Sequence, residues 1–158
     1  VADDILGHLY IGEEENGIWK FDADPSGSKE GVLIDTIGPH IAADVEGLTL
    51  YYASETDGYL IASSQGDDTY TIYSRGDINN FIGRFSVVDS ETIDGTSSTD
   101  GIDVCNMGLG GKLSDGIFIV QDDVNDVGNQ NFKIISWGEI ASIFNPPLEI
   151  NSGYDLRN

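Results

Sequence analysis

The sequence has few basic residues, which excludes several classes of partner. Its 158 residues include only seven Lys and Arg against 28 Asp and Glu, giving a formal net charge of −21 at pH 7. Phosphate backbones are bound by clustered Lys and Arg side chains, so this charge opposes binding to nucleic acid and to anionic membranes, and we expect neither as a partner. It favours cations as partners instead.

Cysteine and long apolar runs are also scarce. Cys105 is the single cysteine, so no intrachain disulfide can form. No apolar run approaches the roughly 20 residues of a transmembrane helix. The chain contains no signal peptide and opens at Val1 rather than at a methionine, from which we expect a processed or truncated start. With 39% hydrophobic residues, the chain is nevertheless too apolar for a disordered acidic tail.

Short apolar runs separated by turn residues predict an all-β protein. Turn pairs such as Asn16-Gly17 and Asp57-Gly58 divide the runs. Nine runs rich in aromatic and β-branched residues are predicted to be strands: Leu9–Ile11, Gly17–Phe21, Val32–Ile37, Leu48–Ala53, Tyr59–Ser63, Thr69–Tyr73, Phe81–Val88, Ile117–Val120 and Phe132–Ser136. One short helix is predicted from Trp137 to Phe144, ended by Pro146-Pro147, and residues 148–158 are expected to form an irregular tail.

The strands also repeat along the chain. The segment Gly7–Glu14 resembles Leu48–Glu55, about 40 residues later, and Gly116–Asp122 supplies a third copy. In each copy an apolar strand ends at an acidic residue, namely Glu14, Glu55 or Asp122. Repeats of this length with several strands each predict a β-propeller, here with about three blades. Because propellers close with 4–8 blades, either residues 1–158 are part of a larger ring, which we favour, or the propeller interpretation is wrong.

Carboxylates concentrate at strand ends and in loops. The acidic clusters are Glu13–Glu15, Asp44 with Glu46, Asp94–Asp103, and Asp122–Asp126. If the repeats are equivalent, these clusters lie on one face, where carboxylates repel one another unless they are protonated or metal-bound. The available ligands are oxygen atoms, including those of Gln65 and Asn125, which favours Ca²⁺ over Mg²⁺ and makes zinc unexpected. The alternative is that each acidic turn is simply solvated.

Six motifs resemble one known family. They are Tyr10–Phe21 (YIGEEENGIWKF), Ala43–Ala53 (ADVEGLTLYYA), Gly58–Gly66 (GYLIASSQG), Asp94–Val104 (DGTSSTDGIDV), Gly116–Asp122 (GIFIVQD) and Asn129–Lys133 (NQNFK). In this order they resemble the C-terminal half of the β-propeller phytases, calcium-dependent enzymes that remove phosphates from inositol hexakisphosphate (phytate). The resemblance implies a partial propeller domain over residues 1–158, with about three blades of a six-bladed ring.

The resemblance also implies a set of calcium ligands. Glu14, Asp44 and Glu46 correspond to carboxylates that act through catalytic calcium ions, joined by Gln65. Asp94 and Asp100 correspond to ligands, direct or through water, from the following loop. Asp122 and Asn125 correspond to a separate stabilising calcium site, although many relatives have Gly-Glu-Asn where this chain has Asp123-Val124-Asn125. Calcium would offset the negative charges and activate a bound water for attack on a phosphate.

The family's substrate-gripping Lys and Arg residues belong to N-terminal blades whose motifs do not occur here. We therefore expect catalysis to require those upstream blades, with phytate or calcium-phytate as substrate and a secreted or periplasmic location. Lys20 and Lys133 are interpreted as strand residues, and Arg75 and Arg84 as surface charges. Two alternatives are a non-catalytic calcium-binding propeller module and another calcium-dependent propeller hydrolase such as a lactonase, against which the Asp94–Asp103 run argues.

Overall fold

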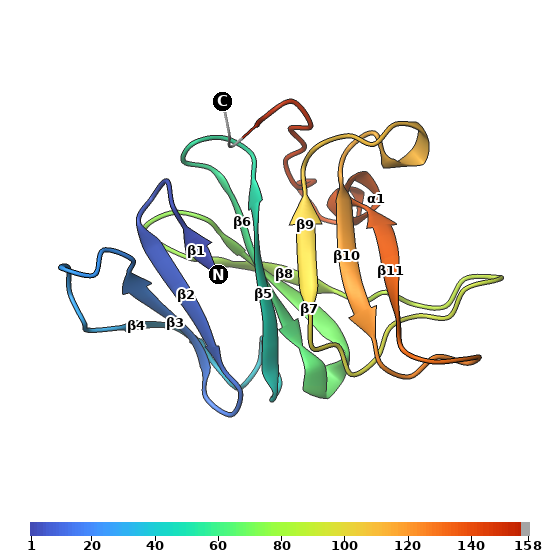
Figure 1. The fold of residues 1–158 in the computed structure, drawn as a ribbon, viewed down its shortest axis with the longest axis horizontal. Helices are drawn as coiled ribbons and strands as arrows, with labels where there is room; N and C mark the ends of the chain where they lie inside the picture. The colour runs from blue at the N-terminus through green and yellow to red at the C-terminus, as the bar shows by residue number, and fades with distance from the viewer. Residues whose placement is uncertain (156–158) are drawn as a thin grey trace.

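The computed structural model describes residues 1–155, which form three antiparallel β-sheets and one short helix (Figure 1). The first sheet contains β1 (Ala2–Asp3), β2 (His8–Glu13), β3 (Gly17–Asp22) and β4 (Val32–Thr36). The second contains β5 (Val45–Tyr52), β6 (Gly58–Ser64), β7 (Thr69–Ser74) and β8 (Phe81–Phe85). The third contains β9 (Ile102–Cys105), β10 (Ile117–Asp122) and β11 (Asn131–Ser136), followed by α1 (Trp137–Ser142). The 3₁₀ turns are η1 (Gln65–Asp67) and η2 (Gly111–Leu113).

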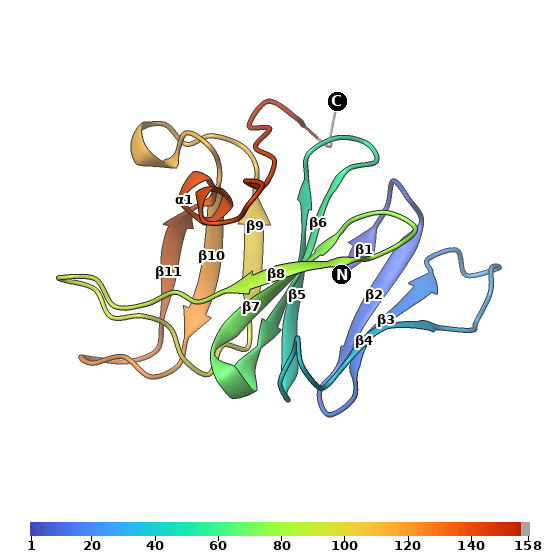
Figure 2. The ribbon, with the colours of Figure 1, turned by 180° about the vertical axis from the view of Figure 1, so that it is seen from behind.

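Each sheet is a meander in which consecutive strands pair, so the sheets follow one another in chain order. β5 lies against both β2 of the first sheet and β9 of the third, which makes the second sheet the middle one (Figures 1 and 2). The all-β expectation is confirmed, and all nine predicted strands are present. Within residues 1–155 the sheets do not close into a ring.

The middle sheet is buried on both faces, because successive strand side chains point to opposite sides. Leu60 and Ala62 of β6 pack toward the first sheet, whereas Ile61 packs toward the third. The core between the first and second sheets contains Tyr10, Ile18, Ile41, Val45, Leu50, Leu60, Ala62 and Tyr73. The core between the second and third contains Tyr51, Ala53, Ile61, Tyr70, Ile72, Phe85, Phe118, Val120, Trp137, Ile140, Ala141 and Leu148.

The helix and the tail complete the second core. Trp137 is fully buried and stacks on Tyr51, with ring centroids 4.2 Å apart. Its indole N–H donates to the carbonyl oxygen of Glu149 at 3.1 Å, which fixes the tail against α1. The helix ends at Ser142, two residues before the predicted end. The predicted irregular tail has no helix or strand through residue 155, and residues 156–158 lie outside the described residues.

The topology corrects the alignment of the sequence repeat. β2 and β10 are second strands of their sheets, whereas β5 is a first strand, so the three copies do not occupy equivalent positions. The equivalent strands are β2, β6 and β10, which lead to Glu14, Gln65 and Asp122 respectively. Glu55 lies in the β5–β6 turn, at the opposite end of the sheets (Figure 1). The mismatch arose because β1 and β9, with two and four residues, were too short to predict.

Gly58 opens β6 at a position that tolerates no side chain. Its φ is +143°, and an added Cβ would overlap the carbonyl oxygen of Tyr51. Gly76 has a similar φ of +126°, but nothing surrounds its Cβ position. We expect Gly58→Ala to lower the free energy of unfolding by roughly 2–3 kcal/mol and Gly76→Ala by about 1 kcal/mol, measured by urea denaturation. Equal losses would show that the Tyr51 contact is not responsible.

Candidate metal centre

Five of the predicted site residues lie at one end of the sheets, the lower edge in Figure 1. Glu14 occupies the β2–β3 turn, Asp44 and Glu46 flank the first residue of β5, Gln65 begins η1, and Asp100 precedes β9. These five residues are called the acidic group below. They come from all three sheets, and they meet because β5 lies between β2 and β9.

Hydrogen bonds connect the segments that carry the acidic group. The amide of Val45 donates to the carbonyl oxygen of Glu14 at 3.0 Å, and the amide of Gln65 donates to that of Asp44 at 2.9 Å. The Gln65 side chain then donates from Nε2 to Oδ1 of Asp100 at 2.7 Å. These bonds fix the β2–β3 turn, the start of β5, η1 and the loop before β9 relative to one another.

Gly47 explains why the loop before β9 approaches β5 so closely. A Cβ at Gly47 would lie 2.8 Å from the amide nitrogen of Ile102 and 3.0 Å from the carbonyl oxygen of Asp100. Both distances are shorter than an ordinary van der Waals contact. The glycine after Glu46 in the Asp44-Val-Glu-Gly47 motif is therefore required to bring Asp100 toward Asp44 and Glu46.

The carboxylates of the acidic group repel one another. Partial burial raises the pKa of Glu46, and the neighbouring charges of Glu14, Asp100 and Asp44 raise it further. Within residues 1–155, no Lys, Arg or His side chain forms an ion pair with any of these four carboxylates. An uncompensated group of carboxylate and amide oxygens fits a hard divalent cation, Ca²⁺ in particular.

The acidic group is not a closed coordination shell as it stands. Among the described residues, no three His, Cys, Asp or Glu side chains lie close enough together to hold a metal ion. Glu14 and Asp100 are exposed, whereas Asp44 and Glu46 are half-buried. The backbone therefore brings the four carboxylates to one edge of the molecule, and their side chains would have to converge around a cation.

Two other predicted ligands, Asp94 and Asp122, form a separate network with Lys133. Lys133 Nζ lies 2.9 Å from Oδ1 of Asp94 and 2.6 Å from Oδ2 of Asp122, and it also donates to the carbonyl oxygen of Gly95. Asp122 is fully buried, and Lys133 is 8% exposed. These three side chains are called the Lys133 group below.

The charges of the Lys133 group stabilise one another. The hydrogen bond from Lys133 and the amide of Asp126 lower the pKa of Asp94. Burial alone would lower the pKa of Lys133, but hydrogen bonds to Asp122 and Asp94 raise it overall. The sequence analysis treated Lys133 as an ordinary strand residue and missed this role. Strand pairing was the available signal, because Lys133 lies opposite Val120, one side-chain repeat from Asp122 on the same face.

Asn125, the eighth predicted ligand, has its side chain engaged within its own loop. Its Nδ2 donates to the carbonyl oxygen of Asn129 at 3.0 Å and to that of Asp122 at 3.4 Å. Its Oδ1 accepts from the side chain of Asn131. The eight predicted ligands thus divide between the acidic group, with five, and the surroundings of Lys133, with Asp94, Asp122 and Asn125.

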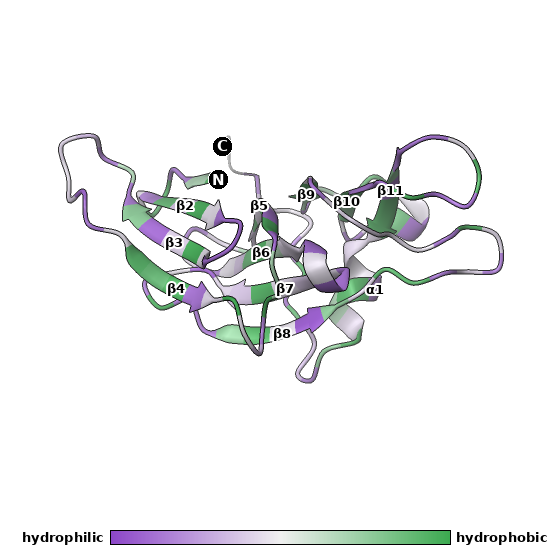
Figure 3. Ribbon diagram, turned by 90° about the horizontal axis from the view of Figure 1, so that it is seen from below, coloured by the Kyte–Doolittle hydropathy of each residue, from purple (hydrophilic) through white to green (hydrophobic). Residues whose placement is uncertain are grey.

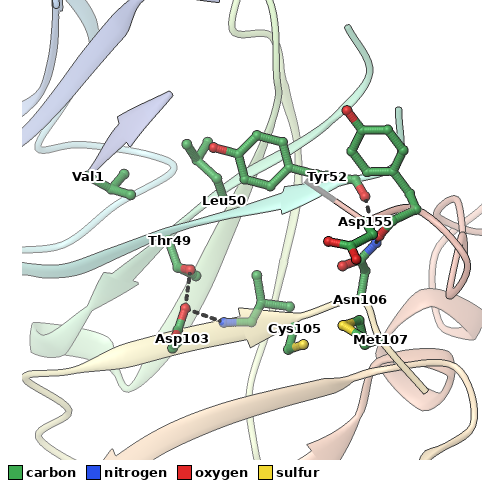
Figure 4. A pocket seen from close by; sticks show the side chains of 11 residues that line it. Val1, Thr49, Leu50, Tyr52, Asp103, Cys105, Asn106, Met107 and Asp155 are labelled. Atoms are coloured by element: carbon green, nitrogen blue, oxygen red, sulfur yellow. Dashed lines mark hydrogen bonds between the residues drawn. The ribbon is translucent and has the colours of Figure 1, made fainter. Parts of the chain in front are cut away.

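Asp103, the last carboxylate of the Asp94–Asp103 run, joins two sheets. Its Oδ1 accepts from Thr49 Oγ1 of β5 and from the backbone amide of Val104, both at 2.8 Å (Figure 4). A hollow of about 260 Å³ lies beside this contact and is lined in part by Tyr52, Cys105 and Met107. Asp103 therefore holds β9 against β5, next to the acidic group rather than in it.

Arg84 and Arg75, both expected to be surface charges, differ in burial. Arg84 is partly exposed and pairs with Asp67 at 2.9 Å, as expected of a surface charge. Arg75 is buried and pairs with the buried Asp3, so its interpretation as a surface charge is wrong.

No helix in residues 1–155 is both long enough and apolar enough to span a membrane.

Three antiparallel sheets with a group of carboxylate and amide oxygens at one end define the chain's class: an all-β protein with a candidate metal centre. A model of the phytase family matches residues 1–158. A 3-phytase from Bacillus subtilis (strain 168) is 53% identical over 146 residues, which cover 89% of this chain and 38% of that protein.

The chain therefore belongs to the phytase family, and the resemblance carried by the six motifs is confirmed. It spans little more than a third of the length of the curated relative it matches.

Proposed function

We propose that this chain forms part of a β-propeller phytase, a calcium-dependent enzyme that hydrolyses phosphomonoesters of phytate. The acidic group is the observation that carries the proposal, since it gathers four carboxylates and an amide from three sheets with no basic partner among residues 1–155. The name of the Bacillus subtilis relative, 3-phytase, supports phytate as the substrate.

The proposed propeller consists of these three sheets as successive blades of a six-bladed ring. The meander topology and the central place of β5 between β2 and β9 support it. β11 is the last strand in the order of the third sheet, and its Phe132 and Ile134 are 71% and 56% exposed. Figure 3 shows this apolar strand at one end of the row of sheets. The remaining part of the protein would cover such surfaces, in line with the 38% coverage of the relative.

Glu14, Asp44, Glu46, Gln65 and Asp100 are the residues that would hold calcium. Bound calcium would offset the charges of the carboxylates and of the substrate phosphates, and would lower the pKa of a nearby water molecule. Without such cations, a protein of net charge −21 would repel a polyanionic substrate.

The chain's own residues serve this chemistry by position. Gln65 orients Asp100 through its 2.7 Å hydrogen bond, and the half-buried Asp44 and Glu46 present carboxylates from the start of β5. No Lys or Arg of residues 1–155 pairs with the acidic group, so residues that grip substrate phosphates would come from the remaining part of the protein.

Phosphate release from calcium-phytate tests the proposal. We expect a protein extended to the length of the relative to release phosphate with calcium present and to stop when a chelator is added. Residues 1–158 alone should release none, because the phosphate-gripping residues are missing. An extended protein that binds calcium but leaves phytate intact would favour a non-catalytic calcium-binding module instead.

A further inference from the structure

We propose that Lys133 is the resident cation of the Lys133 group, in place of calcium, and that it positions the loop carrying Asp100. The first part of this proposal is independent of the proposed function, whereas the second part rests on it. The carboxylates, the ammonium and the loop bonds that support the proposal are all within the described residues.

Every carboxylate oxygen of the Lys133 group already accepts a hydrogen bond. Asp122 Oδ1 accepts from the amide of Ser97 at 2.9 Å, and Oδ2 accepts from Lys133 at 2.6 Å. Asp94 Oδ1 pairs with Lys133 at 2.9 Å, and Oδ2 accepts from the amide of Asp126 at 3.1 Å. Amide and ammonium hydrogens thus point at the oxygens that calcium would need.

The charge and the surroundings of the site also disfavour calcium. A buried ammonium between two carboxylates offsets half of their combined charge of −2, and it would repel a divalent cation placed beside it. Two oxygen ligands of the neighbouring loop are also engaged in hydrogen bonds, because the Asn125 side-chain oxygen accepts from Asn131 and the Asp123 carboxylate accepts from Gln130. The residues present therefore do not fit the stabilising calcium site that the resemblance implies for Asp122 and Asn125.

The Lys133 group connects directly to the loop that carries Asp100. Lys133 binds the carbonyl oxygen of Gly95, and its partner Asp122 binds the amide of Ser97. The end of β10 continues the attachment, since Gln121 accepts from the amide of Asp100 at 2.8 Å and donates its own amide to Gly101 at 2.9 Å. Lys133 is thus a positioning residue that acts on the acidic group through β10 and this loop.

Amide hydrogen exchange of the full-length protein, with and without EDTA, tests the resident-cation role. In the wild type we expect the amide of Ser97, which donates to Asp122, to exchange equally slowly in EDTA and in calcium. Lys133→Met should accelerate exchange of the amides of Ser97 and Asp100 at least about 10-fold relative to the wild type in EDTA, because Asp94 and Asp122 then lack the ammonium. Lys133→Arg should restore much of the protection, and Lys112→Met, at an exposed lysine, should change nothing. A wild-type Ser97 amide that became unprotected in EDTA alone would overturn the proposal.

Calcium titration by calorimetry provides the second measurement. Its Asp122→Asn variant keeps the proposal testable even if Lys133→Met folds poorly. Asp122→Asn keeps an oxygen for Ser97 and leaves Lys133 paired with Asp94, so we expect an unchanged number of bound calcium ions. Loss of one ion in Asp122→Asn would show that calcium, not Lys133, occupies the site. Lys133→Met should weaken binding at the acidic group about 10-fold, as loss of an outer support of a metal site does. If the wild type bound no calcium, the proposed function would fail, while the exchange result in EDTA would stand.

Discussion

Replacing Arg75 with methionine is expected to lower the free energy of unfolding by about 3–5 kcal/mol, because it leaves the buried carboxylate of Asp3 without a partner. Both side chains have no solvent exposure. Asp3 belongs to β1 of the first sheet and Arg75 follows β7 of the second, so the pair fastens one sheet to the next. A methionine fills much of the same volume but supplies no hydrogen-bond donor.

The geometry explains why the pair is strong. Arg75 Nε lies 2.6 Å from Oδ2 of Asp3, and a second guanidinium nitrogen lies 2.9 Å from Oδ1, which makes a bidentate bond. The remaining nitrogen donates to the carbonyl oxygens of Ser54 at 3.0 Å and Asp57 at 3.2 Å. The guanidinium also lies 4.3 Å from the ring centroid of Tyr52. The Arg75 guanidinium thus donates hydrogen bonds both to the Asp3 carboxylate and to two carbonyl oxygens of the β5–β6 turn.

The effect should depend on pH in a defined direction. Burial alone would raise the pKa of Asp3, but hydrogen bonds from Arg75 and from the amide of Leu6 lower it overall. A carboxyl with a lowered pKa in the folded state stabilises the protein above its ordinary pKa, near 3.9, and loses that contribution as the pH falls through the lowered value. The gap between wild type and Arg75→Met should therefore be largest at neutral pH and narrow on acidification.

Urea denaturation at pH 7 and near pH 3, below the ordinary pKa of an aspartate, measures this gap. Arg84→Met is the matched control, because Arg84 also pairs with an aspartate but its side chain is 46% exposed. We expect that variant to lose less than about 1 kcal/mol at either pH. Equal losses in the two variants would mean that burial of the Arg75–Asp3 pair has no energetic consequence.

Arg75 also shows where sequence reasoning reached its limit. Asp3 and Arg75 are 72 residues apart, and nothing local to either residue indicates the pairing. Periodicity and turn residues predicted the strands because those signals are local, and they missed β1 and β9 because two to four residues carry too little pattern. Long-range partners require the sheet order, which a local pattern does not contain.

In the candidate site, too, local motifs predicted some features and long-range strand pairing determined others. The motifs identified the members of the acidic group. Glu14 and Gln65 follow strands that the pattern predicted, whereas Asp100 precedes β9, which the pattern missed. The motifs did not separate Asp94 from Asp100, which are six positions apart but face different partners, Lys133 and Gln65. That separation depends on the pairing of β10 with β11, which places Lys133 opposite Val120 and within reach of Asp94.

Replacing Glu46 with glutamine is expected to change stability in opposite directions with and without calcium. In a chelator, the wild-type carboxylate is repelled by Glu14, Asp100 and Asp44 after partial burial has already raised its pKa. A carboxyl with a raised pKa in the folded state destabilises the protein as the pH rises through that range. Because Glu46 is only half-buried, solvent screening limits the effect, and Glu46→Gln should raise the unfolding midpoint by about 1–3 °C in chelator at pH 7.

With saturating calcium, the same substitution removes a charged ligand and the order should reverse. We expect calcium affinity to fall roughly 10–100-fold, and phosphate release from calcium-phytate by the extended protein to fall with it at limiting calcium. The wild type should then melt at a higher temperature than the variant, because binding to the native state stabilises it in proportion to affinity. Thermal unfolding followed by circular dichroism in both conditions, with a calcium titration, measures the reversal.

Glu55→Gln separates a local role of Glu46 from a general effect of charge. It removes the same charge from an exposed turn at the opposite end of the sheets, so its small change should have the same sign in both conditions. If Glu46→Gln behaved like Glu55→Gln, the raised pKa of Glu46 would reflect only the repulsion among neighbouring carboxylates, and calcium would bind elsewhere. A reversal confined to Glu46→Gln has one physical explanation, that the charges which destabilise the metal-free protein are the charges that bind the metal.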